Sequence, residues 1–158
     1  MREADGDPDG AIALYEALYA RDSGNAVVAN NLASLLASHR DDAASLERAY
    51  LVARRLRGSD VPQFQDTYGW LLHRRGDSAQ ALTFLAPAAA ALPENPLAQY
   101  HVAEALLALG RPAEARTAYA RVLALSATGP EAEAARARIA GIDAGAPPAQ
   151  AATDQTDG

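Results

Sequence analysis

Cysteine is absent from this chain of 158 residues, and so is lysine. Without cysteine there is no disulfide, no cysteine-ligated zinc or iron–sulfur site and no thiol nucleophile. All 14 basic residues are arginines, and because 20 residues are acidic the net charge is −6. A negative net charge does not attract nucleic acid or anionic lipid. We therefore expect no nucleic acid partner.

Long apolar runs and catalytic signatures are missing as well. No apolar run reaches the length that spans a bilayer, about 18 residues, and the opening MREADGDPDG has no apolar core of a signal peptide. The glycine-rich phosphate loop, the dinucleotide fingerprint and the nucleophile elbow are absent. His39, His73 and His101 fit no metal-ligand spacing. The sequence predicts no membrane span, no enzyme activity, no cofactor and no metal.

Alanine dominates the composition, and runs of valine, isoleucine, threonine and aromatic residues that favour strands are missing. Apolar residues recur at i, i+3, i+4 and i+7 in every long segment, which is the spacing of one helix face. The sequence therefore predicts an all-α protein.

Similar short loops recur along the chain. GDPDGA begins at Gly6, HRDDAA at His39, GDSAQA at Gly76 and GRPAEA at Gly110. The last two glycines are 34 residues apart. Before the last three loops come matching apolar segments, NNLASLLA, DTYGWLLH and YHVAEALL. A period of this length indicates a helical repeat in which each helix pair stacks on the next.

The repeats resemble the tetratricopeptide repeat (TPR) family, whose 34-residue helix–turn–helix unit has the pattern W-x₂-L-G-x₂-Y, A-x₃-F, P. Tyr68, Gly69 and Leu72 take the first places, and Ala81 and Leu85 follow on the second helix. The small residue lets the two helices of a pair approach closely. This resemblance implies a right-handed α-solenoid of antiparallel helix pairs.

We expect a TPR array over residues 1–140. A lone second helix occupies 8–21, full repeats cover 26–58, 62–94 and 96–127, and a capping helix covers 130–140. Residues 141–158 are rich in Gly, Pro, Ala and Asp and are expected to be a disordered tail. A repeat that begins at its second helix suggests a fragment of a longer array, whose exposed N-terminal helix could form a dimer.

In the family, set positions of the first helix of each pair line a concave groove that binds a protein or peptide. Carried onto this chain, the resemblance implies a groove of eight residues: Asn30, Ser34, Asp66, Trp70, His73, Arg74, Tyr100 and Glu104. Spacing alone places the four from Asp66 to Arg74 on one helix face. Tyr100 and Glu104 are expected beside them, on the next repeat.

Two interpretations of Trp70, the only tryptophan, remain open at this point. As a groove residue it would be, with Tyr100, an aromatic anchor for a peptide or a sugar ring, surrounded by polar and arginine contacts. Alternatively, it packs against neighbouring helices as ordinary core. The arginine-rich run ARRLRG at 53–58 similarly either ends a helix or binds a phosphate or an acidic peptide.

A closer likeness rests on N-N-L-A and D-T-x-G-W, at residues 30–33 and 66–70. These motifs are similar to the C-terminal repeats of bacterial TPR proteins tied to exopolysaccharide export and PEP-CTERM sorting. The likeness implies a periplasmic location and a possible polysaccharide ligand. A chaperone-tail clamp is disfavoured, because such clamps use lysine and this chain has none.

Overall fold

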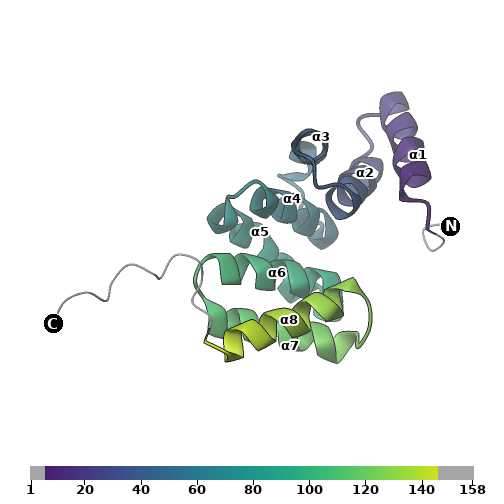
Figure 1. Cartoon of the computed structure of the whole chain (residues 1–158). Helices are drawn as coiled ribbons and strands as arrows, with labels where there is room; N and C mark the ends of the chain where they lie inside the picture. Colours follow the sequence, from purple (N-terminus) through teal and green to yellow (C-terminus); the bar gives the residue numbers. More distant parts are fainter. Residues whose placement is uncertain (1–5, 146–158) are drawn as a thin grey trace, which may run out of the picture. The chain divides into compact units, whose positions relative to one another are not determined.

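The computed structural model describes residues 6–145, and all regular elements within them are helical (Figure 1). This confirms the all-α prediction. In chain order the elements are α1 (Pro8–Arg21), α2 (Ala26–His39), α3 (Ala43–Ala53), the 3₁₀ helix η1 (Arg54–Leu56), α4 (Pro62–Arg74), α5 (Ser78–Ala91), α6 (Pro96–Ala108), α7 (Pro112–Leu125) and α8 (Pro130–Asp143).

Side-chain caps and prolines account for most helix starts. Asp7, Asn25, Asp42 and Asn95 each accept a hydrogen bond from backbone amides in the first turn of the helix that follows. Proline lies in the first turn of α1, α4, α6, α7 and α8, where its missing amide hydrogen removes no helical bond.

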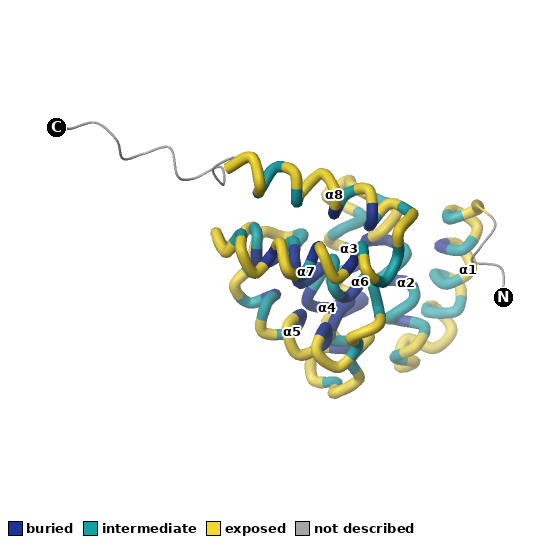
Figure 2. The backbone as a smooth tube through the Cα atoms, turned by 90° about the horizontal axis from the view of Figure 1, so that it is seen from below, coloured by how far each residue is buried: buried dark blue, intermediate teal, exposed yellow. Residues whose placement is uncertain are grey.

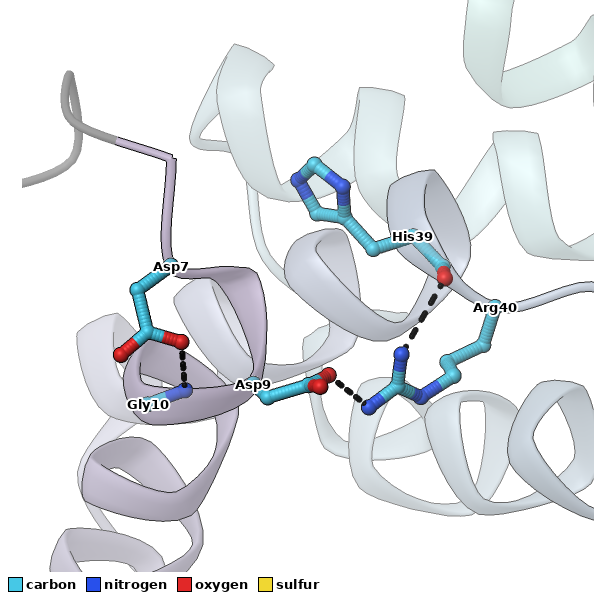
Figure 3. A network of polar contacts seen from close by, with 5 residues as sticks. All are labelled: Asp7, Asp9, Gly10, His39 and Arg40. Carbon is cyan, nitrogen blue, oxygen red and sulfur yellow. Dashed lines mark hydrogen bonds and ion pairs between the residues drawn. The ribbon is translucent and has the colours of Figure 1, made fainter.

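Helices α1 to α4 and the first half of α5 belong to one compact unit, which extends to Phe84. Within this unit α2 packs against α1, α3 and α4. Its core contains Leu32, Val52, Leu56 and Leu71, each no more than 1% exposed. Figure 3 shows how α1 meets the end of α2: Asp7 caps α1, and Asp9 accepts a hydrogen bond from Arg40.

From Leu85 onward the chain forms a second compact unit. Within it α7 packs between α6 and α8, and Tyr119, Val122 and Ala135 are fully buried. The outward turns of α7 and α8 are exposed, as Figure 2 shows in yellow. The capping helix α8 therefore covers α7 with a narrow apolar side and turns a polar side to solvent.

Helix ends differ in detail from the sequence-based boundaries. Helix α3 tightens into η1 over Arg54–Leu56, and α8 continues to Asp143. The tail expected from 141 onward therefore starts inside α8. The remainder of that predicted tail, 146–158, lies outside the described residues.

Candidate functional site

A row of polar side chains crosses the helices of the first unit. The hydroxyl of Thr67 on α4 donates to the side-chain oxygen of Asn30 on α2 at 2.6 Å. The amide of Asn30 lies 3.5 Å from the oxygen of Asn31, and the amide of Asn31 donates to the hydroxyl of Tyr15 on α1 at 3.2 Å. Asn30 is thus a link between α2 and α4. Ser34 is half-buried one turn further along α2.

Trp70 is half-buried on α4. Its ring contacts two nearby side chains. Its ring stacks on that of His73, with centroids 5.1 Å apart and planes inclined by 27°. The guanidinium of Arg74 lies 5.9 Å from the Trp70 ring centroid, within the range of a cation–π contact. Two of the predicted groove residues, His73 and Arg74, therefore contact a third, Trp70.

Arg74 is held in place by hydrogen bonds to the end of α2 and to the loop that follows it. It donates to the backbone carbonyl of Ala37 at 2.9 Å and to the carboxylate of Asp41 at 3.1 Å. The Arg74 side chain is 23% exposed, whereas that of Asp41 is 99% exposed. The bond to Ala37 is made to the last turn of α2, so Arg74 satisfies a carbonyl that the helix end leaves without an intrahelical partner.

The other two polar residues predicted for the groove on α4, His73 and Asp66, differ in burial. His73 shares a hydrogen bond with the hydroxyl of Ser78 at 2.9 Å between Nδ1 and Oγ. Asp66 is 8% exposed, so its carboxylate is less accessible than a groove residue is expected to be. Of the four residues placed on this face by their spacing, Trp70, His73 and Arg74 remain partly accessible.

In the second unit, Glu104 on α6 has partners on both following helices. Its carboxylate accepts from the Arg138 guanidinium of α8 at 3.0 and 3.1 Å, and from the hydroxyl of Tyr119 on α7. The Glu104 side chain is 11% exposed and that of Arg138 is 50% exposed. Glu104 therefore connects the repeat to its capping helix.

Tyr100 lies beside this cluster, with its ring centroid 6.2 Å from that of Tyr119. Burial raises the pKa of Tyr100, and the nearby negative charge of Glu104 raises it further. Burial likewise raises the pKa of Tyr119, and the hydrogen bond to Glu104 adds to the effect. Both phenols therefore stay protonated at physiological pH.

The histidines sit in different surroundings. His39 is exposed at the end of α2 (Figure 3), His73 is half-buried and His101 is 6% exposed. Among the described residues there is no group of three or more His, Asp or Glu side chains that could hold a metal ion.

No helix within the described part of the chain is both long and apolar enough to cross a bilayer.

The sequence of α4 to α8 matches a known family. Residues 72–139 match the family model described as tetratricopeptide repeat. This stretch of the chain is therefore similar in sequence to tetratricopeptide repeats. In fold it is similar to a tetratricopeptide repeat protein from Parabacteroides merdae, with a TM-score of 0.58 and 16% identity over 89% of this chain and 55% of that chain. The chain thus spans about half the length of that TPR protein. No curated protein gives a sequence match.

TPR repeats generally mediate protein–protein interaction, and their fold is typically a non-catalytic scaffold. A further surface feature was missed by sequence reasoning. A cleft of about 750 Å³ lies in the second unit, with Gln99, Val102 and Leu106 of α6 in its lining and alanines of α5 and α7 around them. Alanine-rich faces look like ordinary core in a sequence, so only the packing reveals the cleft.

Sequence reasoning also missed the partners of the residues predicted to line the groove. Thr67, Asn31 and Tyr15 complete the polar row, and Tyr119 and Arg138 complete the Glu104 cluster. The separation of 34 residues between Glu104 and Arg138 equals one repeat, and this spacing is the signal that could have found the pair.

Proposed function

We propose that this chain is a non-catalytic scaffold that binds a segment of a partner protein on the face of α4 that carries Trp70, His73 and Arg74. The observation that carries the proposal is the stack of these three side chains, which is partly accessible and combines an aromatic ring with a guanidinium. Tryptophan and arginine are enriched among the residues that dominate binding energy in protein interfaces.

The stack is also held in one arrangement. Arg74 is tied to Ala37 and Asp41, and His73 to Ser78. A side chain whose geometry is already fixed loses less conformational entropy on binding. These contacts support a preorganised site.

The other groove residues have different roles in this proposal. Asn30 and Glu104 position neighbouring helices through their bonds to Thr67 and Arg138. Ser34 is half-buried and Asp66 is 8% exposed, so both have minor roles in this proposal, and Tyr100 belongs to the second unit. Binding is expected to depend most on Trp70 and Arg74.

A peptide library tests this proposal. Peptides selected on the immobilised chain are titrated against the wild type, Trp70→Ala and Arg74→Ala, with circular dichroism to check folding. We expect each substitution to weaken binding by about tenfold or more, the effect of losing a dominant interface residue. Arg111→Ala, which removes an exposed arginine paired with Glu114, is the matched control. Equal affinity in all four proteins would overturn the assignment.

A carbohydrate ligand is the second candidate, because the same partly accessible ring could stack on a sugar. The likeness of N-N-L-A and D-T-x-G-W to exopolysaccharide-export repeats, and the periplasmic location it implies, remain predictions. Titration of the single tryptophan with neutral and acidic oligosaccharides tests them. A saturable change in emission favours this candidate, and no response at millimolar sugar rejects it.

Self-association through the N-terminal helix is also a prediction. Ile12 is buried at 8% exposure, whereas Leu14 is 58% exposed and Ala17 is also exposed, so part of the apolar surface of α1 is uncovered. If a dimer forms through this helix, Leu14→Asp abolishes it in analytical ultracentrifugation. A wild-type monomer at high concentration would reject the dimer.

A further inference from the structure

The outer side of α3 and η1, in the first unit, carries a concentration of positive charge. Arg54, Arg55 and Arg57 follow one another at the end of this helical stretch, and all three are exposed. Leu51 is 47% exposed and lies about one helical turn before Arg54 and Arg55. We call Leu51 and these three arginines the α3 patch.

The arginines of the α3 patch form no ion pair within the described residues, unlike most other arginines there. Seven arginines of the described residues form ion pairs with carboxylates, for example Arg48 with Glu16 and Arg75 with Glu47. Within residues 6–145 no hydrogen bond or ion pair engages the guanidinium of Arg54, Arg55 or Arg57. Three neighbouring cations thus remain available for carboxylates from another molecule.

An aromatic ring restricts one arginine of the patch, Arg55. The guanidinium of Arg55 lies 5.2 Å from the ring centroid of Tyr19, and that of Arg48 lies 5.3 Å from the same ring. Outside the patch, the Arg75 guanidinium lies 3.7 Å from the ring centroid of Tyr50. Stacked guanidinium groups keep their edges open for bidentate bonds to carboxylates.

The charge of the chain narrows the choice of ligand. A net charge of −6 repels an extended polyanion, such as a nucleic acid or an anionic bilayer, at long range. A short acidic segment meets only the local positive potential. The exposed Leu51 adds an apolar contact that a polar polyanion does not use.

We propose that the α3 patch is a second interaction surface, distinct from the Trp70 site, and that it binds an acidic segment of a partner protein that also carries an apolar side chain. Carboxylates of the segment pair with Arg54, Arg55 and Arg57, and the apolar side chain packs on Leu51. The helix end contributes nothing to anion binding, because its dipole is negative there, so the arginines alone supply the attraction.

Fluorescence anisotropy tests this with a short labelled peptide in which Glu alternates with Leu. The triple variant Arg54→Gln, Arg55→Gln, Arg57→Gln is expected to bind about tenfold or more weakly than the wild type, and Leu51→Ser more weakly by a smaller factor. The control variant Arg111→Gln, Arg121→Gln, Arg136→Gln has the same net charge as the first triple variant. It is expected to bind nearly as tightly as the wild type does. Circular dichroism checks that all variants fold.

Several outcomes would overturn the proposal. They are no binding by the wild type, an equal loss in both triple variants, or an unchanged affinity in Leu51→Ser. Tighter binding of single-stranded oligothymidine or of phosphatidylserine vesicles than of the peptide would assign the patch to a nucleic acid or a membrane instead. None of these results bears on the Trp70 site, since no residue is shared.

Discussion

At the scale of residues, paired asparagines join three helices of the first unit. Asn30 accepts from Thr67 of α4, and Asn31 donates to Tyr15 of α1. The motifs N-N-L-A and D-T-x-G-W therefore contain two residues, Asn30 and Thr67, that bond to each other. This bond gives a structural reason for the two motifs to occur together, whatever the chain binds.

Thr67→Val tests the strength of this bond. Valine keeps the shape and removes the hydroxyl, so the half-buried side-chain oxygen of Asn30 loses its donor. We expect the free energy of unfolding to fall by about 1 kcal/mol, measured by urea denaturation. In the control Thr117→Val, the exposed hydroxyl bonds only to Ala113 of its own helix, and little change is expected. Equal effects would contradict the account.

A pH dependence is expected at the start of α3. The backbone amide of Ser45 donates to Asp42 and lowers the pKa of this carboxyl from its ordinary value of 3.8. Because the folded pKa is the lower one, the stabilisation is present above about pH 4 and is lost as the pH falls through the folded value. Asp42→Ala should therefore lower Tm at pH 7, and the difference from the wild type should shrink near pH 2. A difference independent of pH would contradict this.

At the scale of elements, local signals and tertiary contacts explain different features. Asp7 before Pro8 and Asn95 before Pro96 place helix starts through capping, which acts within a few residues and is visible in a sequence. The tightening of α3 into η1 and the bond from Arg74 to the end of α2 depend on neighbouring helices. The repeat could be predicted from the sequence, but these contacts between helices could not.

The attachment of α8 should depend on Glu104. Removing its charge in Glu104→Gln weakens the two bonds from Arg138 and the bond from Tyr119. We expect a loss of about 1–2 kcal/mol and faster amide hydrogen exchange throughout α8. The control Glu114→Gln breaks only the exposed pair with Arg111 and should leave α8 protected. An unchanged exchange rate in α8 for Glu104→Gln would contradict the role assigned to Glu104.

At the scale of the whole molecule, the period of 34 residues and the helical spacing of apolar residues sufficed to predict the all-α class and the TPR family. Apolar period is a local property that repeats along the chain, so it is readable from one sequence. Binding surfaces are not wholly local, since Arg74 of α4 reaches Ala37 of α2 only after the two helices pack. The groove residues were assigned from the sequence through the helix positions that line the groove in TPR proteins. That this groove binds a ligand stays a prediction.

Fluorescence of the single tryptophan tests the central claim most directly. A peptide selected on the wild-type chain is titrated while the emission of Trp70 is recorded, in parallel with the anisotropy of a label on the peptide. If the partner segment lies on the stack of Trp70, His73 and Arg74, the emission changes saturably with the dissociation constant that anisotropy gives. Saturable anisotropy with unchanged Trp70 emission would place the binding surface elsewhere and contradict the proposed function.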